Sequence, residues 1–161
     1  MTIRVYFIRH GDAEDKHAWE GSDAERPLSA LGIERTTETA EQLARVGFEP
    51  TKILTSPFAR ALQTADIVGG VLECQDLIEV DERLAPGFDI RTFRRIIKEN
   101  VRQDRILLVG HDPSLSTVIE EVMGGGSITL RKSGVARLDL EEMTPPRGRL
   151  AWLDSSSPLT H

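Results

Sequence analysis

The sequence contains a single cysteine and no long apolar run. Cys74 stands alone among 161 residues, so no disulfide can form within the chain, and a reducing compartment is the expected location. The apolar run at residues 5–8 is too short for a secretory signal. No stretch approaches the roughly 20 apolar residues of a membrane span. We therefore predict a cytoplasmic chain that has no membrane partner.

A surplus of positive charge is also missing. Twenty Lys and Arg against 26 Asp and Glu give a formal net charge of −6 at pH 7. Non-specific nucleic-acid binding depends on the opposite balance, so we predict no nucleic-acid partner. Hydrophobic residues make up 39% of the chain and charged residues 29%, as is ordinary for a globular protein. We expect one domain over residues 1–154 and a C-terminal tail over residues 155–161.

Strand and helix patterns alternate along the chain. Short β-branched runs predict strands at residues 3–8, 52–55, 78–80 and 106–109. Helical patterns separate or follow them, at residues 30–46, 57–69, 90–100 and 113–123. Two late strands, at 135–140 and 149–153, are joined by a Pro145-Pro146 turn and predict an edge hairpin. The order predicts a three-layer α/β/α fold whose mainly parallel sheet has an antiparallel edge strand.

Several local details accompany these elements. Ser29 and Ser56 are predicted as helix N-caps, and Pro57 fits the first position of the second helix. Residues 12–27 are polar and predict a long loop, of a length that in compact domains is usually either functional or mobile. The inner face of the first helix is expected to consist of Ile33, Ala40, Leu43, Ala44 and Val46.

Two histidines directly follow predicted strands. Ligands of open α/β sheets bind outside the carboxyl ends of the strands, so we expect His10 and His111 in one pocket. An imidazole with a pKa of about 6.5 is mostly neutral near pH 7 and offers a lone pair to phosphorus. We therefore predict His10 as the nucleophile and His111 as a donor to phosphoryl oxygens. A zinc site is the alternative, but neither histidine has metal-type spacing to a third ligand, so we predict no metal.

Arginines flank these histidines in the sequence and in the predicted fold. Arg9 precedes His10, and Arg60 falls in the first turn of a helix whose N-terminus attracts anions. Guanidinium groups match phosphoryl oxygens in pairs, so both are predicted to bind phosphate. Arg26 is a third candidate donor. Gly11 is predicted to let the backbone approach the phosphate closely.

The proton donor for the leaving group is less clear from the sequence. Glu82 precedes a Pro-Gly turn and is the preferred candidate, although a solvated carboxylate would read the same way. Asp112 follows His111 directly, but it is also well placed as the N-cap of the next helix. We therefore predict Glu82 as the acid and keep Asp112, or no acid, as alternatives.

Three motifs together resemble a known family. Arg9-His10-Gly11, the segment from Ser56-Pro57 through Arg60-Ala61 to Gln63-Thr64-Ala65, and Gly110-His111 resemble the motifs of the histidine phosphatase (phosphoglycerate mutase-like) superfamily. The short length, Asp12-Ala13 after the glycine and Arg26-Pro27-Leu28-Ser29 resemble its small SixA-type phosphohistidine phosphatases. The resemblance implies a phosphoglycerate mutase-like fold, no cofactor and transient phosphorylation of His10. It implies that Arg9, Arg60 and His111 bind the phosphoryl group.

The leaving group favours one substrate class. Imidazole released from phosphohistidine has a conjugate acid near pKa ~6.5, whereas a sugar alkoxide needs general acid catalysis worth ~10²–10⁴. Without a convincing acid, the expected substrate is a phosphorylated histidine on a phosphotransfer protein. The alternatives are a phosphomonoesterase or mutase acting on small sugar or glycerate phosphates, and a phosphate-binding module without turnover. The sequence leaves the oligomeric state open.

Overall fold

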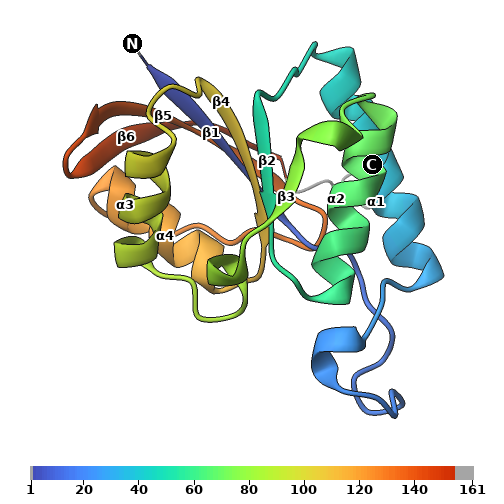
Figure 1. Ribbon diagram of the computed structural model, residues 1–161. Helices are drawn as coiled ribbons and strands as arrows, with labels where there is room; N and C mark the ends of the chain where they lie inside the picture. The colour runs from blue at the N-terminus through green and yellow to red at the C-terminus, as the bar shows by residue number, and fades with distance from the viewer. Residues whose placement is uncertain (1, 155–161) are drawn as a thin grey trace.

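The computed structural model describes residues 2–154 as a six-stranded sheet between two pairs of helices (Figure 1). The strands are β1 (Ile3–Arg9), β2 (Lys52–Thr55), β3 (Ile78–Val80), β4 (Arg105–Gly110), β5 (Val135–Met143) and β6 (Pro146–Asp154). The helices are α1 (Ala30–Arg45), α2 (Ala59–Val71), α3 (Ile90–Glu99) and α4 (Ser114–Met123), with short 3₁₀ turns η1 (Asp23–Glu25), η2 (Gln75–Leu77) and η3 (Glu82–Leu84). The three-layer α/β/α architecture predicted from the sequence is confirmed.

The strand order is β3-β2-β4-β1-β5-β6. The strands β3, β2, β4 and β1 pair in parallel, and β5 and β6 form an antiparallel hairpin at one edge, as predicted. Both strands of the hairpin are longer than predicted, because their pairing continues until Met143 lies opposite Pro146. Pro146 therefore belongs to β6 and not, as the sequence had suggested, to the turn. The carboxyl ends of β1, β2, β3 and β4 therefore all meet at one edge of the sheet.

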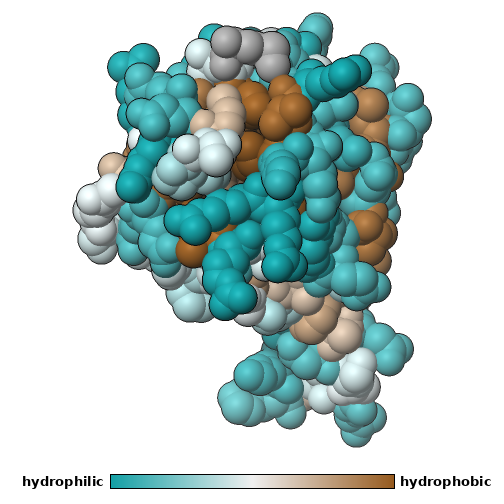
Figure 2. Space-filling view, turned by 60° about the vertical axis from the view of Figure 1, so that its left-hand side comes forward, coloured by the Kyte–Doolittle hydropathy of each residue, from teal (hydrophilic) through white to brown (hydrophobic). Residues whose placement is uncertain are grey.

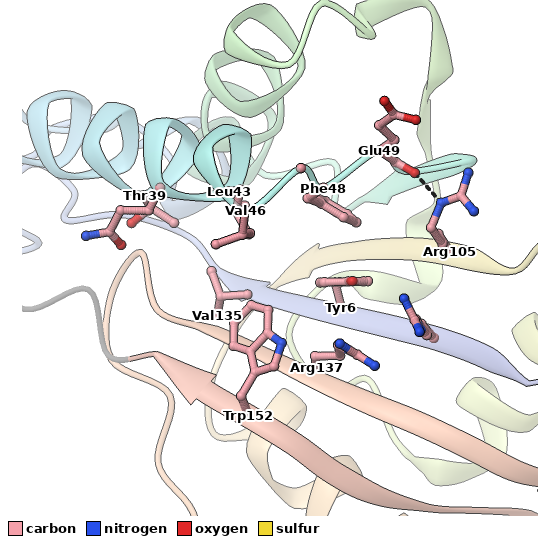
Figure 3. Close-up of a pocket in the computed structure, with 13 residues that line it drawn as sticks. Tyr6, Thr39, Leu43, Val46, Phe48, Glu49, Arg105, Val135, Arg137 and Trp152 are labelled. Carbon is pink, nitrogen blue, oxygen red and sulfur yellow. Dashed lines mark hydrogen bonds between the residues drawn. The ribbon is translucent and has the colours of Figure 1, made fainter.

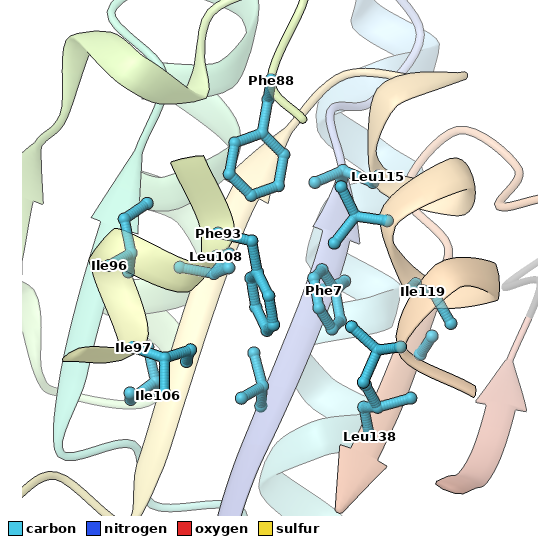
Figure 4. Close-up of a cluster of buried hydrophobic side chains, with 14 of the residues drawn as sticks. Phe7, Phe88, Phe93, Ile96, Ile97, Ile106, Leu108, Leu115, Ile119 and Leu138 are labelled. Atoms are coloured by element: carbon cyan, nitrogen blue, oxygen red, sulfur yellow. The ribbon is translucent and has the colours of Figure 1, made fainter. Parts of the chain in front are cut away.

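Each face of the sheet carries its own apolar cluster. Val5 and Phe7 point toward α3 and α4, and Tyr6 and Ile8 toward α1 and α2. Figure 4 shows the first cluster, in which Phe7 and Phe93 pack with ring centroids 5.9 Å apart. A strand covered on both faces needs apolar residues at successive positions, which explains the continuous apolar run of β1. Each fully buried large side chain contributes about 1.5–3 kcal/mol to stability.

The predicted inner face of α1 is only partly correct. Ala40 and Leu43 are buried, but Ile33 and Val46 are 48% and 72% exposed, and Ala44 is also exposed. The buried positions of this helix are Gly32, Thr36, Thr39, Ala40 and Leu43. The hydroxyls of Thr36 and Thr39 bond to Ser133 Oγ and Ser133 O, both at 2.9 Å. Polar side chains therefore occupy part of the inner face, which a hydrophobic pattern does not reveal.

The ends of the helices agree with the sequence-based predictions at one position and differ at others. Ser29 caps α1, its side chain accepting a bond from Gly32 N at 3.0 Å. Gly124 ends α4 in the left-handed conformation, with φ of 86°. Ser56, however, does not cap α2, and Pro57 is not its first residue, because that helix begins at Ala59 with Phe58 at its N-cap. The serine hydroxyl has another partner, described below.

The predicted long loop at residues 12–27 projects from the body of the molecule at the carboxyl edge of the sheet (Figures 1 and 2). Its surface is mostly hydrophilic in Figure 2. Its two ends are held together by a bridge between Ala13 and Leu28 and by the bond from Glu14 N to Pro27 O, 2.9 Å long. The loop is thus anchored at its base, next to the first residues after β1.

The predicted tail at residues 155–161 lies outside the described residues, so the division into one domain and a tail stays a prediction. None of the helices within residues 2–154 has the length and apolar character needed to cross a membrane.

Candidate active site

The sheet places the two histidines side by side. Arg9 pairs with Gly110 in the parallel register of β1 and β4, so His10 and His111 each emerge one residue later from neighbouring strands. His10 N donates to Gly110 O at 2.9 Å, and the two rings lie 5.1 Å apart between centroids. Only 8% of His10 and 4% of His111 is exposed. The expectation that both histidines share one site at the carboxyl edge therefore agrees with the geometry.

One hydrogen bond fixes the tautomer of His10. Nδ1 lies 2.7 Å from the carbonyl oxygen of Gly11, and a carbonyl can only accept, so Nδ1 carries the proton. Burial, together with the positive charges of Arg60 and Arg9, lowers the pKa of His10 to about 4, against the opposing effect of the Gly11 bond. The ring is therefore neutral near pH 7, and its Nε2 carries an unprotonated lone pair.

His111 is also neutral. Burial lowers its pKa to about 3, and His10 and Arg60 contribute to the shift. Its Nε2 is hydrogen-bonded to the hydroxyl of Ser56 at 2.8 Å, and that hydroxyl accepts the backbone N–H of Phe58 at 3.1 Å. Ser56, at the end of β2, thus orients the ring of His111 instead of capping a helix. A neutral ring can meet phosphoryl oxygens only through an N–H.

Arg9 and Arg60 each carry one buried guanidinium N–H, on Nε, that has no hydrogen-bond partner among the described residues. Arg60 is 5% exposed, and Arg9 Nη1 donates to Leu130 O at 3.2 Å. Both guanidinium charges act on His10 and His111, so they lie within the same electrostatic environment. Buried unpaired donors are costly, and an oxyanion is the group that would satisfy them.

A carboxylate that the sequence did not single out lies among these arginines. Asp23, in η1 of the projecting loop, accepts from Arg60 Nη2 through Oδ2 at 3.0 Å and from Arg60 Nη1 through its backbone oxygen at 2.8 Å. Its Oδ1 accepts from Arg26 Nε at 3.0 Å. The predicted donor Arg26 therefore contacts Asp23 and Glu14 O, although its charge is also felt by His10. No sequence pattern connects residue 23 to residue 60, and only the folded loop brings them together.

The second motif also positions neighbouring segments. Gln63 Oε1 accepts from Leu28 N at 2.7 Å, which ties α2 to the base of the loop. Thr64 Oγ1 accepts from Gly11 N at 3.1 Å, which ties the same helix to the residue after His10. Ala61 and Ala65 are fully buried in the adjacent core. The motif thus supplies Arg60 and also holds in place the base of the loop and the residue after His10.

The structure gives a different reason for glycine at position 11. A Cβ there would lie 2.5 Å from Thr36 Oγ1 and 2.9 Å from Ser133 Oγ. The N–H of Gly11 is bonded to Thr64, so it is not free for a phosphate in this arrangement. Close packing of the strand end against α1 therefore accounts for the glycine, and its role in phosphate binding stays a prediction.

Neither candidate acid is engaged with the histidines. Glu82 lies after β3 at the same edge of the sheet, but it is exposed, and its side chain makes no hydrogen bond or ion pair within residues 2–154. Asp112 accepts from Ser116 N at 3.0 Å and from the Ser116 hydroxyl, so its carboxylate stabilises the start of α4. The sequence-based assignment of Glu82 as the acid stays a prediction without contact support.

The structure offers no support for the alternative of a metal site. Among the described residues, no group of three or more His, Cys, Asp and Glu side chains could hold a metal ion.

A cavity of about 420 Å³ lies away from the histidines, at the end of α1 beside β1, β5 and β6 (Figure 3). Its walls include Arg4, Tyr6 and Trp152. Arg4 is on the order of 20 Å from His10 along β1, at ~3.3 Å per residue. Concavity alone therefore does not mark the site; the convergence of polar groups on His10 does.

The lowered pKa values of the histidines predict an acid-sensitive fold. Both rings take up a proton near pH 6.5 when unfolded, but only near pH 4 and 3 when folded. Between these values the unfolded chain binds more protons, so stability falls as pH falls, by about 2 kcal/mol per histidine from pH 7 to pH 5. Urea midpoints at pH 7 and pH 5 measure this loss. The variant His10→Asn/His111→Asn should lose much less over that interval, and an undiminished pH effect in the variant would refute the assignment.

Comparisons with a family model, with known sequences and with solved structures all point to the same family. Residues 5–88 match the model of the histidine phosphatase superfamily (branch 1). An uncharacterized protein of Picosynechococcus sp. is 33% identical over 141 residues, which cover 84% of each chain. Phosphohistidine phosphatase SixA of Escherichia coli is 29% identical over 143 residues, which cover 87% of each chain. A solved structure of the protein histidine phosphatase SixA complexed with tungstate has a TM-score of 0.87 and 28% identity, and covers 98% of this chain and 99% of that chain.

An α/β sheet with paired histidines and arginines beyond its parallel strands defines a class of phosphoryl-handling proteins, and this chain belongs to the histidine phosphatase superfamily. Within the superfamily it is of the SixA type, because its likeness to SixA proteins extends over most of its length in both sequence and structure. The resemblance drawn from the three sequence motifs is confirmed.

Proposed function

We propose that this chain is a phosphohistidine phosphatase that acts on a histidine phosphotransfer protein through a covalent intermediate on His10. The observation that carries the proposal is the state of the His10 ring. It is buried, neutral and protonated on Nδ1, and the charges of Arg9 and Arg60 act on it. Both arginines carry a buried Nε–H that has no hydrogen-bond partner among the described residues. A nucleophile and two candidate oxyanion donors thus belong to one cluster of side chains.

The reaction follows in two steps. His10 Nε2 attacks phosphorus, and the phosphorus–nitrogen bond of the substrate breaks. The substrate ring, protonated beforehand on its other nitrogen, leaves as neutral imidazole, so this step needs no further proton. Water then attacks the phosphoryl group on His10, which releases inorganic phosphate and restores the neutral ring. Arg9, Arg60 and an N–H of His111 hold the phosphoryl oxygens during both transfers. No step requires a metal or an organic cofactor.

The positions of the two candidate acids support phosphohistidine, in which phosphorus is bonded to nitrogen, as the substrate. Glu82 is exposed and has no side-chain hydrogen bond or ion pair within residues 2–154, and the carboxylate of Asp112 is bonded to Ser116 in α4. An alkoxide leaving group would need such an acid, whereas imidazole leaves with little help. The name of the SixA relative and the tungstate, a tetrahedral oxyanion, in the SixA structure point the same way.

Substrate preference tests the proposal. We expect kcat/KM for a phosphohistidine-bearing phosphotransfer domain to exceed that for a panel of sugar and glycerate phosphates by more than roughly 10²-fold, the low end of the contribution of a general acid. Faster turnover of the small esters, dependent on Glu82 or Asp112, would favour the alternative of a phosphomonoesterase or mutase.

A further inference from the structure

Asp23, a residue of the projecting loop, connects this loop to the proposed phosphate site. Asp23 occupies both terminal nitrogens of Arg60, at 2.8 and 3.0 Å, and Arg26 holds the other carboxylate oxygen of Asp23 at 3.0 Å. The charge of Asp23 also acts on His111, against the effect of Arg60. A carboxylate on a surface loop is therefore part of the histidine and arginine cluster.

The contacts of Arg60 divide its donors into two sets. The two terminal nitrogens are bonded to Asp23, and Cζ of the guanidinium lies over the Phe58 ring, 5.1 Å from its centroid. The remaining donor, Nε–H, is buried and has no partner in the described residues. A guanidinium is planar and rigid, so fixing its two outer nitrogens also fixes the direction in which Nε–H points.

We propose that Asp23 is a positioning residue, which holds Arg60 so that its Nε–H meets the phosphoryl group and thereby links the loop at residues 12–28 to phosphoryl binding. The inference rests on the proposed function in taking the bound anion to be a phosphoryl group. Asp23 does not touch the reacting atoms in this account, and it acts through Arg60. Arg26 serves the same purpose one step further away, by holding Asp23.

The same contact has a competing interpretation, because a carboxylate bound to an anion-binding arginine competes with the anion for that arginine. The exposure of Asp23 decides between them. Its side chain is 47% exposed, so water and salt screen its repulsion of a bound phosphoryl group. The side chain of Arg60 is only 6% exposed, and a long side chain that loses its fixed geometry in such a site is costly to align. The two roles predict opposite changes in phosphate affinity.

Calorimetric titration with inorganic phosphate tests the inference. Asp23→Asn keeps the shape and the backbone acceptor but removes the charge that holds Arg60. We expect the variant to bind phosphate about 10-fold more weakly and to lose roughly 10- to 100-fold in kcat/KM, the scale of lost positioning. Glu25→Gln is the matched control, since it removes the same charge from the same 3₁₀ turn, and it should change neither quantity more than twofold.

A double-mutant cycle separates positioning from general loop damage. If Asp23 acts through Arg60, Asp23→Asn should weaken phosphate binding less than twofold in an Arg60→Lys background. A full 10-fold effect in that background would overturn the inference, as would tighter or unchanged phosphate binding by Asp23→Asn alone. Circular dichroism and the urea midpoint confirm that each variant is folded.

The phosphate-binding test of Asp23 does not depend on the identity of the substrate. Phosphate binding reports on Arg60 and Asp23 even if the wild-type chain does not hydrolyse phosphohistidine, in which case the proposed function fails and the positioning role stands. Hydrolysis of phosphohistidine by wild type, combined with unchanged phosphate binding by Asp23→Asn, gives the reverse result.

Discussion

Replacing His10 by asparagine is expected to reduce phosphohistidine hydrolysis by roughly 10³- to 10⁶-fold, because loss of a nucleophile removes the covalent route altogether. Asparagine is polar and of similar size, so the buried position stays filled, but its amide offers no lone pair to phosphorus. The measurement is phosphate release from a phosphohistidine-bearing domain at saturating substrate.

The control for this variant is His17→Asn. His17 is exposed on the projecting loop and has no place in the proposed reaction, so the same substitution there should leave turnover within twofold of wild type. Inorganic phosphate should still bind to the His10→Asn variant, since Arg9 and Arg60 remain. Turnover by His10→Asn within tenfold of the wild-type rate would contradict the role of His10.

Replacing Arg60 by lysine is expected to lower kcat by roughly 10²- to 10³-fold, the loss seen when one donor to a developing oxyanion is removed. Lysine keeps the positive charge but lacks the buried Nε–H and the two outer nitrogens that Asp23 holds. If Arg60 acted only through its positive charge, the lysine variant would keep nearly all of its activity. If Arg60 acts through directed N–H donors, the variant loses activity.

Steady-state kinetics and phosphate titration together measure this effect. Arg45→Lys is the matched control, because Arg45 is an exposed residue in the last turn of α1 and the same chemical change there should have no effect on kcat. Retention of more than half of the wild-type kcat by Arg60→Lys would show that the fork geometry of Arg60 is not used.

Much of the site could be predicted because its members follow strands directly. His10, His111 and Arg9 lie at or just beyond the ends of β1 and β4, and parallel pairing brings such ends together whatever the loops do. Arg60 was predictable from the proline and small residues that mark the start of its helix. The alternation of strands and helices was sufficient for the three layers of the fold.

The remaining features depend on contacts that no local pattern encodes. Asp23 lies in an irregular loop and meets Arg60 across 37 residues of sequence, so periodicity gives no signal for it. Ser56 has the sequence context of a helix cap, but the ring of His111 lies 2.8 Å from its hydroxyl. The inner face of α1 was mistaken because Thr36 and Thr39 are buried through bonds to Ser133, where an apolar pattern was expected.

The most direct test of the account is to trap the phosphorylated enzyme. Excess enzyme is mixed with a domain carrying labelled phosphohistidine and quenched rapidly in alkali, in which phosphohistidine is stable, and the labelled peptide is then identified by mass spectrometry. We expect acid-labile label on His10, and none on the His10→Asn variant. Hydrolysis without labelled enzyme at any quench time, or label on His111 instead, would contradict a covalent intermediate on His10.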